Sequence, residues 1–172
     1  MRIVYDNIVF AIQKFGGISV VWQELLSRVR QAAQVELKYI DVNQSLVAEN
    51  YSRSKLDIDE KDVLSVIKCP MVSRYLPVSL TESQPFIFHS SYYRYCANPK
   101  AINITTVHDF TYEYFVKGLK QKVHTWQYMD TVGSVDEGHL IIFDRTKEKS
   151  WDERIWHKLC QYNGHDIMVW GM

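Results

Sequence analysis

The sequence predicts an α/β domain built on a mainly parallel sheet with flanking helices. Three observations carry this prediction. The chain opens with a β-branched and aromatic run over residues 3–10, and a glycine pair then leads into an amphipathic helical pattern. Two later apolar runs, over residues 85–91 and 102–109, each end in polar residues. In an open parallel sheet, ligands bind just beyond such strand ends.

The first strand and the first helix are separated by Gly16 and Gly17. After the glycines, apolar residues recur at helical spacing: Ile18, Val21, Trp22, Leu25, Leu26 and Val29. Two adjacent glycines let the backbone turn sharply and approach a ligand, and the following helix directs its unpaired N–H groups at the same place. We therefore expect a phosphate or carboxylate to fit beside Gly16 and Gly17. Many α/β proteins use such glycines only to make the turn, and this alternative stays open.

The middle of the chain is less regular. Residues 35–40 alternate apolar and polar side chains and predict a second strand. Residues 41–62 are polar and predict a loop with about one helical turn. The run 63–80 contains Pro70 and Pro77, so we expect any helix there to be short.

Composition excludes several classes of protein. The 172 residues, 47% of them hydrophobic, can bury the core of one ordinary globular domain. Lys and Arg total 20, as do Asp and Glu, so the net charge gives no argument for nucleic acid as a partner. The three cysteines lie far apart, without metal-site or disulfide spacing. No apolar run approaches the roughly 18 residues of a spanning helix. We expect a cytoplasmic protein, with peripheral membrane contact and homo-oligomerisation left open.

Four stretches together resemble the N-terminal half of a family 4 glycosyltransferase. They are the glycine pair, HSSYYR at 89–94, TVHDFTYE at 106–113 and the basic stretch GLKQKVHTWQ at 118–127. The resemblance covers residues 1–127. It implies a Rossmann-like domain that binds the acceptor, whereas a second domain of such enzymes binds most of the sugar nucleotide.

The resemblance also implies roles for individual residues. Gly16 and Gly17 would lie near the diphosphate of the donor. His108 would lie beside the transferred sugar as a catalytic residue, with Asp109 next to it. The residues implied to bind the acceptor are His89, Ser90, Ser91 and Tyr92. The substrates would be a nucleotide sugar and a glycan or lipid-linked acceptor, with no cofactor and no metal.

Residues 128–172 resemble a different family, the PD-(D/E)XK nuclease-like domain of prokaryotic ATP-binding proteins. The stretches that carry this likeness are EGHLIIFDR, KSWDERIW and IMVWGM, which belong to the end of that domain. The catalytic motif of the family is not among them. We therefore interpret Asp144, Asp152 and Glu153 as solvated turn and strand residues.

The same tail carries two structural predictions. Residues 139–143 form an apolar run that we expect to join the sheet as a further strand. Residues 155–159 and 167–170 are read as an antiparallel hairpin, because Asn163-Gly164 between them is a strong turn pair.

The sequence thus predicts a truncated or chimeric glycosyltransferase, the acceptor-binding half of an enzyme that moves sugar from a nucleotide sugar to an acceptor. We expect it to be weak or inactive alone. One alternative is a remnant of a nuclease-like or ATP-binding protein without its catalytic motif. Another is a non-catalytic interaction module.

Overall fold

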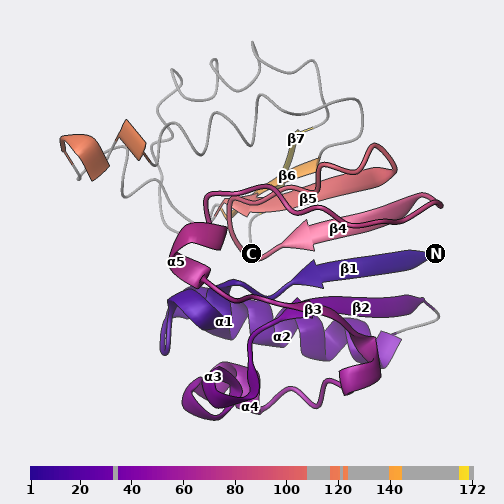
Figure 1. Cartoon of the computed structure of the whole chain (residues 1–172), viewed down its shortest axis with the longest axis horizontal. Helices are drawn as coiled ribbons and strands as arrows, with labels where there is room; N and C mark the ends of the chain where they lie inside the picture. Colours follow the sequence, from indigo (N-terminus) through magenta and orange to yellow (C-terminus); the bar gives the residue numbers. More distant parts are fainter. Residues whose placement is uncertain (33–34, 108–116, 121, 124–139, 145–166, 171–172) are drawn as a thin grey trace.

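An all-parallel sheet runs through the protein in the computed structural model, which describes residues 1–32, 35–107, 117–120, 122–123, 140–144 and 167–170 (Figure 1). The strands, in their order across the sheet, are β3 (Val63–Val66), β2 (Glu36–Asp41), β1 (Arg2–Asp6), β4 (Phe86–Ser90), β5 (Ala101–Val107), β6 (Leu140–Asp144) and β7 (Ile167–Trp170). Each neighbouring pair is parallel. Their carboxyl ends therefore share one edge of the sheet, the carboxyl edge.

The order of the strands reverses between β1 and β4. From β1 the chain proceeds outward through β2 to β3, and it then returns to the other side of β1 with β4 and continues through β5. In open parallel sheets, the crevice at such a switch point is where ligands bind. Any site at the carboxyl edge is therefore expected beside Asp6 and Ser90, the last residues of these two strands.

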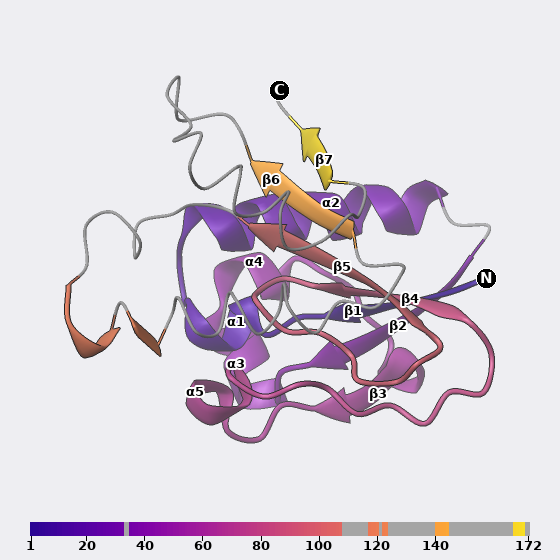
Figure 2. The same cartoon turned by 90° about the horizontal axis from the view of Figure 1, so that it is seen from above.

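The helices are mostly short, apart from one. They are α1 (Val9–Ile12), α2 (Gly17–Ala32), α3 (Gln44–Glu49), α4 (Tyr51–Ser54), the 3-10 turn η1 (Glu60–Asp62) and α5 (Pro70–Ser73). Figure 2 shows α2 lying along one face of the sheet. Among the described residues, no helix has the length and apolar character needed to cross a bilayer.

Two apolar clusters lie on the two faces of the sheet. The cluster under α2 includes Tyr5, Phe10, Trp22, Leu26 and Tyr39. The cluster on the opposite face includes Val4, Ile40, Phe86 and Phe88. Val4 and Tyr5 enter different clusters because successive strand residues point to opposite faces. Each fully buried side chain of this size contributes roughly 1.5–3 kcal/mol, so the two cores hold the edge residues in place.

The structure confirms an α/β architecture with a parallel sheet and flanking helices, and it corrects three local predictions. Residues 3–10 are not one strand: β1 ends at Asp6, and residues 9–12 are helical. A helical turn lets Ile8 enter one core while Val9 and Phe10 enter the other. Residues 41–62 hold three short helical segments, where about one turn was expected, and the run 63–80 begins with strand β3, which was not predicted. The expectation that any helix in that run is short is confirmed by α5, which has four residues.

The predicted C-terminal hairpin is not shown. Its second segment, residues 167–170, is strand β7 and pairs in parallel with β6. Its first segment, residues 155–159, lies outside the described residues. Residues 140–144 pair with β5, so part of the tail extends the same sheet as the first 107 residues.

Candidate functional site

The candidate site lies at the carboxyl edge, where the amino end of α2 meets the ends of β1 and β4. Helix α2 begins at Gly17, and the amides of a first helical turn have no partners within the helix. No acidic side chain occupies the first turn of α2. The positive end of the helix dipole is therefore not offset by a carboxylate on α2 itself.

Gly16 and Gly17 are not equivalent in this turn. A Cβ atom at Gly16 would lie 2.7 Å from Oε1 of Gln13, so Gln13 would have to move. At Gly17 the added atom would meet no described residue within 4 Å, and neither glycine has a positive φ. The contact at Gly16 is only with the end of the flexible Gln13 side chain, so the steric reason for glycine there is weak, and a Cβ atom at Gly17 would enter open space.

Two buried oxygens in this segment lack a hydrogen bond within the described part of the chain. They are Oε1 of Gln13 and Oγ of Ser19, and Ser19 is fully buried in the first turn of α2. An unsatisfied buried polar atom costs about 1–3 kcal/mol. Polar groups at this end of α2 are thus incompletely satisfied by the protein.

His89, the predicted acceptor residue on β4, lies beside α2. Its ring packs edge-on against Trp22 in the second turn of α2, with centroids 4.9 Å apart. Nε2 of His89 lies 3.1 Å from Oγ1 of Thr106 on β5. Burial raises the pKa of the adjacent Tyr5 phenol to about 12, so Tyr5 is neutral at physiological pH. The fold therefore brings His89 and the glycine turn to the same face of the carboxyl edge.

Ser90 and Ser91 are fully buried, and their hydroxyls bond within the protein. Oγ of Ser90 donates to Oδ2 of Asp6 (2.9 Å). Oγ of Ser91 donates to the Asp6 carbonyl (2.7 Å) and accepts from the amide of Val9 (3.0 Å). These bonds join the ends of β1 and β4 across the switch point. The binding of a sugar acceptor by Ser90 and Ser91 stays a prediction.

Asp6 also pairs with Arg94, the last residue of the HSSYYR stretch. Nη1 of Arg94 donates to Oδ1 of Asp6 at 2.9 Å, and Asp6 has no exposed surface. Burial raises the pKa of Asp6, whereas the Arg94 charge and the Ser90 hydroxyl act against this rise. Sequence analysis did not single out this ion pair. The sequence offered two signals for it: Asp6 ends a buried strand, and Arg94 lies in the polar stretch that follows β4.

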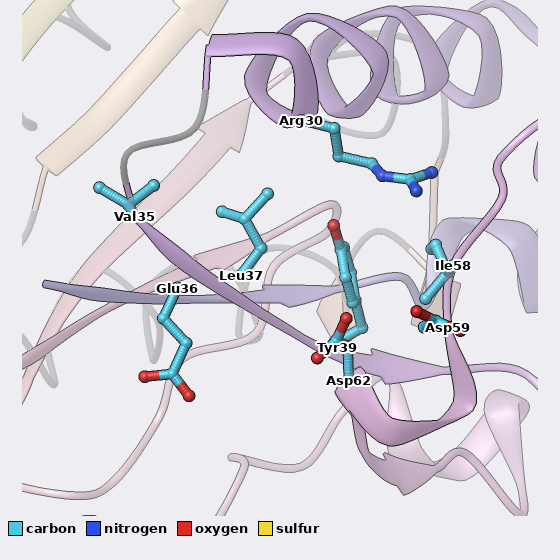
Figure 3. Close-up of a pocket in the computed structure, with 8 residues that line it drawn as sticks. All are labelled: Arg30, Val35, Glu36, Leu37, Tyr39, Ile58, Asp59 and Asp62. Atoms are coloured by element: carbon cyan, nitrogen blue, oxygen red, sulfur yellow. The ribbon is translucent and has the colours of Figure 1, made fainter.

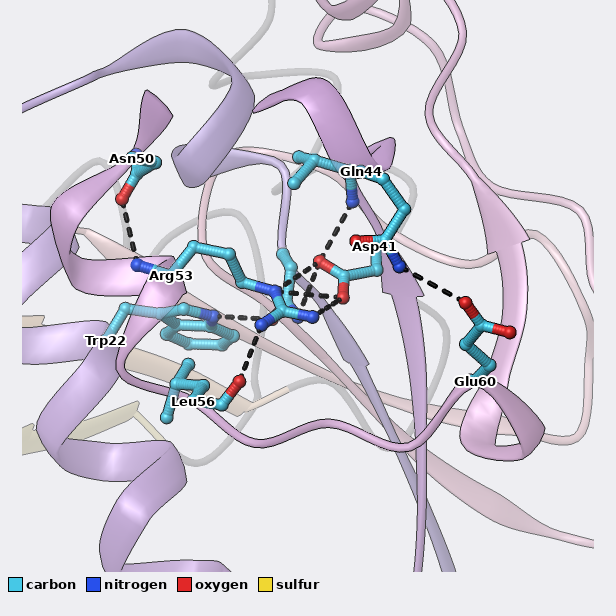
Figure 4. Close-up of polar contacts among 9 residues, drawn as sticks. Trp22, Asp41, Gln44, Asn50, Arg53, Leu56 and Glu60 are labelled. Atoms are coloured by element: carbon cyan, nitrogen blue, oxygen red, sulfur yellow. Dashed lines mark hydrogen bonds and ion pairs between the residues drawn. The ribbon is translucent and has the colours of Figure 1, made fainter. Parts of the chain in front are cut away.

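A second buried ion pair lies beneath the turn that precedes α2 (Figure 4). Nε of Arg53 lies 3.0 Å from both carboxylate oxygens of Asp41, and Nη1 of Arg53 donates to the Leu56 carbonyl at 2.7 Å. Asn7 links this pair to α2, because its Nδ2 donates to Asp41 and its Oδ1 accepts from Nε1 of Trp22. The charges at the base of the turn are therefore fully engaged.

Asn50 fixes the turn itself. Its Nδ2 donates to the carbonyls of Phe10 (3.0 Å) and Gln13 (2.6 Å), and its Oδ1 accepts from the amide of Arg53 (2.9 Å). The segment between α1 and α2 is thus held from below, which presets the position of Gly16 and Gly17. Sequence analysis treated Asn50 as a loop residue and missed this role.

Tyr92 is half-buried and packs between aromatic and cationic groups. Its hydroxyl accepts from Nη2 of Arg74 at 2.6 Å, and its ring lies edge-on to Tyr93 at 4.8 Å between centroids. The two remaining predicted site residues, His108 and Asp109, lie outside the described residues. Within the described ranges, no group of three or more potential ligands can hold a metal ion.

Comparisons with known proteins do not assign the chain to a family. No family model matches it, and no significant match was found among curated proteins or solved structures.

Proposed function

We propose that the chain binds the diphosphate of a nucleotide sugar at the amino end of α2, as the acceptor-binding half of a glycosyltransferase. One observation carries this proposal: helix α2 begins at Gly17, its first turn has no acidic residue, and a Cβ atom at Gly17 would meet no described atom within 4 Å. A fold that needed Gly17 only for a tight turn would show a positive φ or a crowded Cβ position.

The topology supports a Rossmann-like assignment. The order β3-β2-β1-β4-β5-β6 corresponds to the 3-2-1-4-5-6 order of dinucleotide-binding doubly wound sheets. In such sheets the helix that follows the first strand directs its amino end at a phosphate group. Here that helix is α2, although the one-turn helix α1 precedes it.

Sugar transfer would require two sets of groups at the carboxyl edge, one for the diphosphate and one for the acceptor. The leaving diphosphate is stabilised by positive dipoles, and the acceptor hydroxyl is oriented by hydrogen bonds. The α2 amides would serve the diphosphate, and His89 and Tyr92 would orient the acceptor. His108 and Asp109, which directly follow β5 in the sequence, stay proposed as the groups beside the transferred sugar.

Binding by this chain alone should be weak. An anion at an exposed helix end gains only about 0.3–1 kcal/mol from the dipole, and the resemblance places most donor contacts in a second domain. We therefore expect measurable binding of a nucleoside diphosphate and little or no sugar transfer.

The test is a calorimetric titration of the chain with UDP, comparing Gly17→Ala with Gly17→Asp. Both side chains fit the open space, and Asp is well tolerated at the start of a helix, so both variants should fold. We expect Gly17→Ala to bind UDP within about threefold of the unmodified chain, because it adds no charge. Gly17→Asp should bind at least about tenfold more weakly, because its carboxylate competes for the helix amides.

Two outcomes would contradict the proposal. One is equal UDP binding by the two variants, which would place UDP elsewhere on the protein. The other is the absence of saturable binding to the unmodified chain, which would favour a non-catalytic interaction module.

A further inference from the structure

A pocket of about 280 Å³ lies away from the carboxyl edge, between the carboxyl end of α2 and the amino-terminal half of β2 (Figure 3). Leu37 and Tyr39 of β2, Arg30 of α2 and Ile58 contribute to its lining. Ligand pockets typically measure roughly 300–1,000 Å³, so this one suits a ligand smaller than a typical drug. Its apolar side chains favour an apolar body on such a ligand.

The three carboxylates of the lining are already paired with cations. The pairs and their N–O distances are Glu36 with Arg2 (3.0 Å), Asp62 with Lys38 (2.9 Å) and Asp59 with Lys61 (2.7 Å). Their cations do not themselves line the pocket, and Arg2 also pairs with Glu82, so the acidic charges of the lining are balanced in part from outside it. Arg30 is the one cation among the described lining residues.

Arg30 is half-buried and makes no hydrogen bond or ion pair with the described part of the chain. Figure 3 shows its guanidinium extended over the pocket toward Ile58. Arginine side chains in protein interiors normally pair with carboxylates or accept a ligand anion. The five N–H donors of this guanidinium are available to a ligand.

Tyr39 supplies a second donor. The residue is 2% exposed, and its hydroxyl points toward the α2 side of the pocket (Figure 3) without a hydrogen bond to any described residue. Burial raises the pKa of the Tyr39 phenol and the charge of Arg30 lowers it, so the guanidinium acts on this hydroxyl. The same lining holds Asp59, whose pKa is lowered by Lys61 and also by the charge of Arg30, and Asp62, which raises the pKa of Tyr39, but neither carboxylate is hydrogen-bonded to the two donors in the described part of the chain.

We propose that this pocket binds a small organic carboxylate with an apolar body, such as an arylalkanoate. Arg30 and the Tyr39 hydroxyl donate to the carboxylate, and Leu37 and Ile58 contact the apolar body. Charge-assisted bonds from arginine to carboxylate are among the strongest in proteins, which makes the carboxylate the recognised group. The site is separate from the amino end of α2 and does not depend on the function proposed there.

The test is a calorimetric titration of the whole chain at pH 7 with 3-phenylpropanoate and, separately, with the uncharged 3-phenylpropanamide. We expect saturable binding of the carboxylate and at least about tenfold weaker binding of the amide. Arg30→Gln should weaken carboxylate binding at least about tenfold, and Tyr39→Phe about three- to tenfold.

Arg28→Gln is the matched control, because Arg28 is on the same helix with a side chain 83% exposed and only a long 4.0 Å pair with Glu24. It should bind the carboxylate within about twofold of the unmodified chain. The proposal is overturned if the carboxylate does not bind saturably, if the amide binds equally well, or if folded Arg30→Gln binds normally. Should Arg30→Gln fail to fold, the carboxylate and amide titrations of the unmodified chain decide the question.

Discussion

Two regions of this protein differ in whether their charged side chains have partners. At the carboxyl edge, Asp41 pairs with Arg53, and the fully buried Asp6 accepts hydrogen bonds from Arg94 and Ser90. At the other end of β2, Arg30 and the Tyr39 hydroxyl have no hydrogen-bond partner among the described residues. Buried charges with full sets of partners stabilise one conformation, whereas donors left open beside a pocket are available to a ligand.

At the carboxyl edge itself, the side chains that hold the structure in place differ from the groups that are available to a ligand. Ser90 and Ser91 have hydroxyls that can form hydrogen bonds, but both hydroxyls donate to Asp6 and so join β1 to β4. Gly17 has no side chain, and a Cβ atom at this position would meet no described atom within 4 Å. The groups most available to a ligand at this edge are therefore backbone amides held in place by buried side chains.

The largest expected effect is on the Asp41–Arg53 pair. Arg53→Met removes one partner and leaves a buried carboxylate without its cation, which should lower the free energy of unfolding by about 3–5 kcal/mol. Urea denaturation followed by circular dichroism measures it.

Arg30→Met is the matched comparison, since it makes the same substitution at the open pocket. Because Arg30 has no partner to leave unpaired, the free energy of unfolding should change by less than about 0.5 kcal/mol. Similar losses in the two variants would show that Arg30 also has a structural partner, and the contrast between the regions would fail.

A smaller loss is expected at the switch point. Ser91→Ala removes the acceptor of the Val9 amide and the donor to the Asp6 carbonyl, so the free energy of unfolding should fall by about 1–3 kcal/mol. Ser54→Ala removes an exposed hydroxyl that donates to the Tyr51 carbonyl, and it should change stability by less than about 0.5 kcal/mol. A Ser91→Ala variant as stable as Ser54→Ala would mean that water replaces both bonds without cost.

Part of this structure could be predicted from sequence because its signals are local. Residues 35–40 alternate cleanly and form β2 one residue later, and the apolar run before His89 is β4. Strand β3 was missed because it is an edge strand whose residues 64–66 are exposed, so its pattern was not that of a buried strand. Helix α1 was missed because its apolar residues also suit a strand, and tertiary packing decided between them.

For the candidate site, only the start of α2 can be compared with the prediction. The glycine pair before an amphipathic helix is a local pattern, and it correctly located the amino end of α2. The Asp6–Arg94 pair joins residues 88 apart, and the pocket assembles three segments of the chain. Such contacts depend on strand order and register, which single-sequence patterns do not specify.

In our proposals, the two ends of α2 carry two separate binding sites. The most direct test is an amide NMR titration of one sample with UDP and then with 3-phenylpropanoate. We expect UDP to shift the amides of Gly16, Gly17 and Ile18, and the carboxylate to shift those of Leu37, Tyr39 and Ile58, without competition between the two ligands. Shifts in one common set of residues, or shifts spread over exposed lysines, would contradict the assignment of two separate sites at opposite ends of α2.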